Sequence, residues 1–142
     1  MPVERSAGAV IYYRQGKKIE YLLLQYLHQH WDSSRGHVED GETDMMAAQR
    51  EIREETGLDN LKFLPGFKKE ISWFYKKKGL TKASYKEAVY FLAPSKTKKI
   101  KISHESLDYK WVTLEHALKL KTFPIVKEVL KEAASFLAKP KF

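Results

Sequence analysis

Residues 35–58 read RGHVEDGETDMMAAQREIREETGL and are crowded with carboxylates, although the 142-residue chain carries a formal net charge of +8 at pH 7. From Thr43 onward, the stretch consists mostly of helix formers and contains no Pro or Gly until Gly57. The Thr43 hydroxyl can cap the helix N-terminus, and Gly57 suits the left-handed position just past the C-terminus. The pattern predicts a helix of about three to four turns from Thr43 to Thr56.

Three glutamates of this helix, Glu51, Glu54 and Glu55, are spaced at i, i+3 and i+4. Their carboxylates therefore share one face within about 6 Å of one another, where like charges repel. A hard divalent cation such as Mg²⁺ would compensate the repulsion, because it takes oxygen ligands from carboxylates and from substrate phosphates. The alternative is a solvated acidic surface helix in which Arg50 pairs with a glutamate.

The spacing of the fixed residues separates these two interpretations. Gly36, then Glu42 after five residues, then the segment REIREETGL at 50–58 after seven more match every position of the Nudix box, Gly-x5-Glu-x7-Arg-Glu-U-x-Glu-Glu-x-Gly-U. At average residue usage, the seven fixed residues match by chance on the order of once in a hundred million starting positions. The chain thus resembles the Nudix hydrolases.

This resemblance implies an α/β/α sandwich that uses a divalent metal to hydrolyse a nucleoside diphosphate linked to another group. By motif position, it implies that the three glutamates of the acidic face bind metal and that Gly36 adds its carbonyl oxygen. It also implies that Glu42 and Arg50 orient the box helix.

The rest of the chain predicts an α/β fold with a mixed sheet, in the order ββ-α-βββ-αα, in one domain over residues 1–142. The apolar second strand of the first hairpin is typical of a strand covered on both faces, so helices should flank the sheet. The box helix would dock through Met45, Ala48 and Ile52, and the last helix through Ile125, Val129, Ala133 and Phe136 or Leu137. The expected strands are 7–13, 19–25, 68–75 and 84–92, with 100–102 and 109–112 as short strand candidates, and the further helices are 114–120 and 124–138.

Composition limits the setting in which the protein works. An excess of Lys and Arg, with a pI near 9.5, favours polyanionic partners such as nucleotides, nucleic acid or an anionic membrane. The chain has no Cys, so neither a disulfide framework nor a thiolate site is available. No apolar run could span a bilayer and the first residues lack a signal-peptide core, so we expect a cytoplasmic location and no membrane partner.

Segments outside the box are similar to the asymmetrical diadenosine tetraphosphate hydrolases of the Nudix family. They are His30-Trp31, the segment GHVE at 36–39, the stretch 61–73, Tyr90-Phe91-Leu92, and the segment from ISHE at 102–105 to Lys110-Trp111. This resemblance covers most of the chain. It implies that diadenosine tetraphosphate is cleaved to ATP and AMP by in-line attack of water on phosphorus, with Mg²⁺ or Mn²⁺ bound.

The same resemblance suggests further site residues. Glu105 would be an additional metal ligand or general base, or else an exposed loop glutamate. Tyr90 would stack on adenine, or else be a core aromatic, and Trp31 would be a base platform or a core residue. Arg35 and His37 would touch phosphates. With Glu51 and Glu54, Glu105 completes the set expected to be catalytic.

One segment departs from the subfamily pattern, which usually has Pro-Lys-Gly where this chain reads Ser34-Arg35-Gly36. Arg keeps the positive charge and adds a bidentate grip on phosphate. Loss of the Pro predicts a more relaxed loop, so that the substrate preference is less defined than the reaction type.

Other functions remain compatible with the sequence. An RNA 5′-pyrophosphohydrolase would use the same helix, with the lysines of 76–78 and 96–101 on the RNA backbone. A nucleoside triphosphate pyrophosphohydrolase would also fit, and so would a non-catalytic nucleotide-sensing or RNA-binding module. The sequence leaves open whether the protein is a monomer or a homodimer.

Overall fold

The structure is a computed structural model that describes residues 3–76, 79 and 83–139. Within these residues the strands are β1 (Val3–Gln15), β2 (Lys18–Tyr26), β3 (Trp31–Asp32), β4 (Arg35–His37), β5 (Lys69–Tyr75), β6 (Ser84–Pro94) and β7 (Ser106–Val112). The helices are α1 (Asp44–Thr56), α2 (Leu114–Ala117) and α3 (Pro124–Ala138). Both predicted hairpins, the box helix and the C-terminal helix are confirmed.

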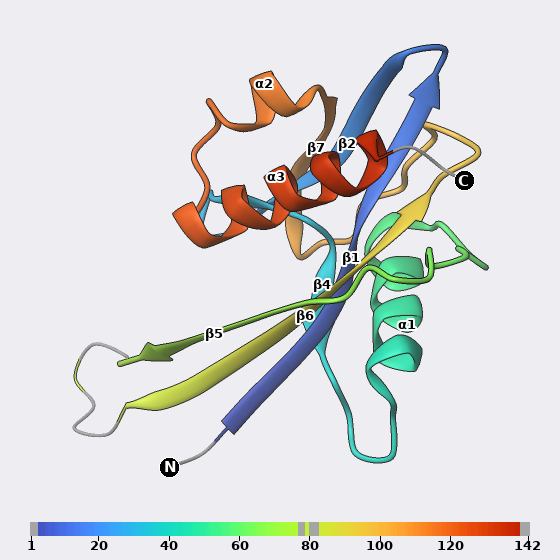
Figure 1. Cartoon of the computed structure of the whole chain (residues 1–142). Coiled ribbons are helices and arrows are strands. Elements are labelled where there is room, and N and C mark those ends of the chain that lie inside the picture. Colours follow the sequence, from blue (N-terminus) through green and yellow to red (C-terminus); the bar gives the residue numbers. More distant parts are fainter. Residues whose placement is uncertain (1–2, 77–78, 80–82, 140–142) are drawn as a thin grey trace.

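Strand β1 lies at the centre of the sheet (Figure 1). In the described part of the chain, the strand order is β3-β2-β1-β6-β5, with β4 paired to β1 and β7 paired to β2. Strand β1 runs parallel to β6 and antiparallel to β2 and β4, so the sheet is mixed, as predicted. The pairing of Gly8 with Arg35 brings β4, which contains the first residue of the box, against the central strand.

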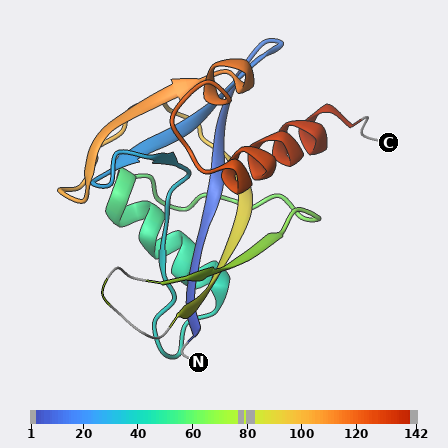
Figure 2. The ribbon, with the colours of Figure 1, turned by 90° about the vertical axis from the view of Figure 1, so that its left-hand side faces the viewer.

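Helices cover both faces of this sheet, which confirms the α/β/α arrangement. Figure 2 shows α1 on one side and α3 on the other. Alternate residues of β1 point to opposite faces, as strand geometry requires. Ala9 and Ile11 pack in one core with Ile52 of α1, whereas Val10 packs in the other core with Val129 of α3.

Several details differ from the sequence prediction. Residues 100–102 are not a strand, because the backbone there is tied to α1 by a hydrogen bond from Lys101 N to Thr56 O (2.9 Å). Of the helix predicted over 114–120, only α2 (Leu114–Ala117) is helical, and 118–120 form a turn. Strands β3 and β4 were not expected from the sequence.

The predicted contact faces of two helices also need correction. Met45 and Ile125 are exposed, and the buried apolar side chains of α1 are Ala47, Ala48 and Ile52. On α3 the core face is formed by Val126, Val129, Leu130 and Ala133. Among the described residues, no helix is long and apolar enough to cross a membrane. The cytoplasmic location stays a prediction.

Arg5 of β1 joins three parts of the fold through one guanidinium. It donates to both carboxylate oxygens of Asp44 in the first turn of α1 (2.9 Å each), to Glu87 of β6 (3.2 Å) and to Glu70 of β5. The hydrogen bonds from Arg5 lower the pKa of Asp44. We call this group the Arg5 cluster; it ties the box helix to the β5–β6 hairpin.

Replacing Arg5 by Met should lower the free energy of unfolding at pH 7 by about 2 kcal/mol, because the partly buried carboxylates of Asp44 and Glu87 and the exposed Glu70 lose their shared partner. The stabilisation of Asp44 is present above its unfolded pKa near 3.8 and is lost as pH falls through its lower folded pKa. The difference between variant and wild type should therefore shrink at pH 3. Urea denaturation at both pH values measures it, with exposed Arg14→Met as the control. An equal difference at both pH values would contradict this account.

Candidate active site

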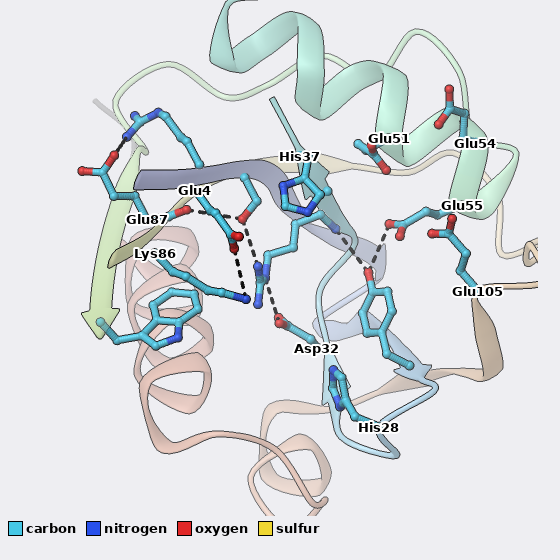
Figure 3. A pocket seen from close by; sticks show the side chains of 16 residues that line it. Glu4, His28, Asp32, His37, Glu51, Glu54, Glu55, Lys86, Glu87 and Glu105 are labelled. Atoms are coloured by element: carbon cyan, nitrogen blue, oxygen red, sulfur yellow. Dashed lines mark hydrogen bonds and ion pairs between the residues drawn. The ribbon is translucent and has the colours of Figure 1, made fainter. Parts of the chain in front are cut away.

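Helix α1 begins and ends as its sequence predicts. The Thr43 hydroxyl accepts a hydrogen bond from Met46 N (3.1 Å), and Gly57 adopts the left-handed conformation with φ of 79°. Both caps hold the helix in a fixed register, so Glu51, Glu54 and Glu55 project from the end that faces β4 and the loop before β7 (Figure 3).

Arg50 organises the carboxylates around it. Its guanidinium binds both oxygens of Glu42 (2.8 and 2.9 Å), Glu51 (2.9 Å) and Glu54 (3.3 Å), and donates to the carbonyl oxygen of His37 (2.9 Å). The hydrogen bond from Arg50 lowers the pKa of Glu42 to about 2. These contacts tie the loop that follows β4 to the box helix, as the motif implied.

Gly36 leaves the space that Glu51 occupies. A Cβ atom at Gly36 would lie 2.1 Å from the Glu51 carboxyl carbon and within 2.2 and 2.6 Å of its two oxygens. No side chain fits between this backbone and the glutamate. The absence of a side chain therefore brings the backbone of β4 into direct contact with the Glu51 carboxylate.

Glu55 is the most enclosed of the three glutamates, with 3% of its surface exposed. Its Oε1 accepts hydrogen bonds from Ser34 Oγ (2.6 Å) and from Tyr26 Oη (3.1 Å). Burial, together with the nearby Glu51 and Glu105, raises the pKa of Glu55 to about 8. The predicted relaxation of the loop at Ser34 is wrong, because Ser34 is buried and its hydroxyl is bound to the box helix.

An open cleft of about 350 Å³ brings most of the expected site residues together (Figure 3). One wall is acidic and is formed by Glu51, Glu54, Glu55 and Glu105. The rest of the lining includes Arg35, Lys86, His28 and His37 together with the carboxylates of Glu4, Asp32 and Glu87. Gly36 also lines the cleft. The cleft thus combines the oxygen ligands of the acidic wall with the cationic side chains of Arg35 and Lys86.

Two of the residues expected to bind the base do not reach this cleft. Tyr90 is fully buried and packs in the core beneath α3, so it cannot stack on a nucleobase. Trp31 is also in that core, with 6% of its surface exposed, and does not line the cleft. For both residues, the alternative of a core aromatic is the one that the structure supports.

The structure adds lining residues that the sequence analysis did not select. Trp73 of β5 lies in the cleft, with the Arg35 guanidinium 5.6 Å from its ring centroid, and Lys86 lies on the adjacent β6. Tyr26, His28 and Asp32 also line the cleft. Trp73 belongs to the stretch 61–73 that resembles the subfamily, which was a usable signal, whereas nothing in the sequence pointed to Asp32.

The donor set fits a divalent metal. Four carboxylates and a glycine carbonyl are hard oxygen donors of the kind that Mg²⁺ and Mn²⁺ bind. Their side chains are not gathered as a closed site: no group of three acidic or His side chains within the described ranges has that arrangement. Arg50 donates hydrogen bonds to one oxygen each of Glu51 and Glu54, and Ser34 donates to one oxygen of Glu55. The second oxygen of each carboxylate could bind a metal while these hydrogen bonds remain.

Comparison with known proteins agrees with the fold and the box. The family model described as the NUDIX domain matches residues 2–133. The mouse bis(5′-nucleosyl)-tetraphosphatase (asymmetrical) is 36% identical over 146 residues, which cover 94% of this chain and 95% of that protein. The crystal structure of an Ap4A hydrolase from Caenorhabditis elegans superposes with a TM-score of 0.77 at 34% identity, over 96% of this chain and 99% of the other.

A more limited relation exists to RNA-processing enzymes. The RNA pyrophosphohydrolase of Bartonella quintana is 32% identical over 82 residues, which are 53% of this chain and 46% of that protein. The chain belongs to the NUDIX family. Nudix hydrolases are generally dependent on divalent metal ions, in keeping with the carboxylate-rich cleft.

Proposed function

We propose that this protein hydrolyses dinucleoside polyphosphates and cleaves diadenosine tetraphosphate asymmetrically into ATP and AMP. The observation that carries the proposal is one cleft that holds both the acidic wall and the cationic side chains of Arg35 and Lys86. A polyphosphate needs cations along its length, which a divalent metal bound at the acidic wall would supply together with Arg35 and Lys86. The almost full-length similarity to asymmetrical tetraphosphatases supports this substrate class.

The metal ligands in this proposal are Glu51, Glu54, Glu55 and the carbonyl of Gly36, with Mg²⁺ as the expected ion and Mn²⁺ as the alternative. Of the two roles expected for Glu105, the proposal takes that of general base. When bound, the metal supplies Lewis-acid chemistry, since it neutralises phosphate charge and makes water more acidic. Glu51 and Glu55 are held close to the backbone of β4 and to Ser34, respectively, so their approach directions are restricted.

The protein groups have separate roles in hydrolysis. Arg35 and His37 bind the phosphates and hold the chain in line with the attacking water. Glu105 accepts the proton as the water oxygen forms its bond to phosphorus and the bridging P–O bond breaks. One water is consumed for each ATP and AMP formed. The reaction requires no covalent intermediate on the protein.

Product analysis tests this proposal directly. The protein with Mg²⁺ is incubated with diadenosine tetraphosphate and, in parallel, with a short triphosphorylated RNA, and the products are separated by chromatography. ATP and AMP in equal amounts are expected from the dinucleotide. Two molecules of ADP would contradict asymmetric cleavage.

Release of pyrophosphate or orthophosphate from RNA alone would assign the protein to the RNA-processing branch. Of the lysines considered for RNA contact, Lys77 and Lys78 lie outside the described residues. A variant with Glu128→Gln on α3, far from the cleft, controls for purification and should match the wild type.

A further inference from the structure

Asp32 is a buried carboxylate that lines the cleft but does not belong to the acidic wall. Only 3% of its surface is exposed. Its Oδ2 accepts a hydrogen bond from Arg35 Nε (3.0 Å), and its Oδ1 accepts from Ser33 N (2.7 Å). The hydroxyl of Tyr90 donates to both oxygens (3.0 and 3.3 Å). Asp32 therefore has a full set of donors, and one of them comes from the fully buried Tyr90.

The Arg35 guanidinium is fixed on several sides. Asp32 holds Nε, and Ser6 Oγ of β1 accepts from Nη1 (2.9 Å). The ring of Trp73 lies 5.6 Å from the guanidinium carbon. An arginine guanidinium stays protonated at physiological pH, and these contacts give Arg35 one orientation on the cleft lining.

Burying the Asp32 carboxylate with Arg35 costs desolvation free energy. A buried ion pair is often no more stable than an apolar pair of similar volume, because desolvation offsets the attraction. Stability alone therefore does not explain a buried Asp–Arg pair that also receives a hydrogen bond from a buried Tyr hydroxyl. The need to orient the Arg35 guanidinium does explain it, since a planar guanidinium binds phosphate well only when its N–H groups point at the ligand.

We infer that Asp32 and Tyr90 are positioning residues that orient Arg35 toward the polyphosphate in the cleft. The inference rests on the proposed function, because it takes Arg35 as a phosphate-binding group. Tyr90 acts through Asp32, and Asp32 acts through Arg35. Neither touches the substrate itself. The chain thereby has an oriented guanidinium, that of Arg35, at the position where the subfamily usually has Lys.

A double-mutant cycle tests the inference. The four proteins are the wild type, Asp32→Asn, Arg35→Met and the double variant. Each is titrated calorimetrically with a methylene-bridged ATP analogue in Mg²⁺ buffer, so that binding is measured without turnover. Asp32→Asn should raise the Kd about tenfold in the wild-type background, and by less than about twofold when Arg35 is already Met. Tyr90→Phe, which keeps the ring, should raise it about threefold to fivefold through the same route.

Kinetics with diadenosine tetraphosphate provide the second measurement. Because the wild type must turn over first, failure of the proposed function appears in the wild type, whereas failure of this inference appears only in the cycle. Asp32→Asn and Tyr90→Phe should raise KM more than they lower kcat. Exposed Asp59→Asn is the control and should change neither constant.

A structural role would give a different pattern. If Asp32→Asn raised the Kd equally with and without Arg35, or if all changes followed the loss of melting temperature, the positioning role would be overturned. If Asp32→Asn did not fold, Tyr90→Phe in the two Arg35 backgrounds would decide the same question. An unchanged Kd in folded Tyr90→Phe would refute the contribution of Tyr90.

Discussion

Turnover of diadenosine tetraphosphate should fall about 100-fold or more when Glu54 is replaced by Gln, even at saturating Mg²⁺. The substitution keeps the shape of the side chain and removes one negative charge from the acidic wall. Glu54 is 56% exposed and accepts a single hydrogen bond, from Arg50 at 3.3 Å, so the fold does not depend on it. Steady-state kinetics over a range of Mg²⁺ concentrations, together with thermal unfolding, measure both effects.

The melting temperature should stay the same or rise slightly, since one like-charge repulsion is removed. Glu128→Gln is the matched control, because Glu128 is similarly exposed and forms a comparable helix pair with Lys131 at 3.1 Å. Full turnover of the Glu54 variant would show that Glu54 is neither a metal ligand nor catalytic.

Replacing Gly36 by Ala should separate activity from stability. The new methyl group would lie 2.1 Å from the Glu51 carboxyl carbon, which is at the end of a flexible side chain and can move away. The protein should therefore fold, with a melting temperature within a few degrees of the wild type. The displaced Glu51 carboxylate should cost about 10- to 100-fold in kcat/KM, because catalytic groups must be held in place.

Gly8 provides the contrasting variant. A Cβ atom there would lie 1.9 Å from the carbonyl oxygen of Ser34 and 2.6 Å from the Cα atom of Arg35, which are backbone atoms that cannot move independently. Gly8→Ala should therefore unfold the protein or lower its melting temperature strongly. If Gly36→Ala kept full activity, the close contact with Glu51 would have no part in catalysis.

The elements that sequence reasoning predicted well are those fixed by local chemistry. Helix α1 has a capping hydroxyl at Thr43 and a glycine at Gly57, and both act within one turn of the helix that they end. The first hairpin follows from two runs of strand-forming residues and from the turn at Gly16 between them, which has a φ of 63°. The glutamates expected to bind metal were selected by their spacing and by the resemblance to the Nudix box, and the cleft brings them together. Their roles as ligands stay predictions.

The elements that were missed depend on distant partners. Strands β3 and β4 have two and three residues and exist because they pair with β2 and β1, not because of their own propensity. Residues 100–102 look like a strand, yet their side chains pack on the core from a loop. Tyr90 is buried by the position of α3, and Asp32 is buried by Tyr90 and Arg35, so no local pattern could reveal either.

The parallel pairing of β1 with β6 has a consequence for how the chain folds. Arg5 and Glu87 are register partners that lie 82 positions apart, so the central strand pair closes a long loop. Closing such a loop is entropically costly and slows folding in proteins dominated by non-local contacts. The N-terminal strand must wait, during synthesis, until residues up to Pro94 have left the ribosome. The box helix can form early, but its cleft can assemble only at that late stage.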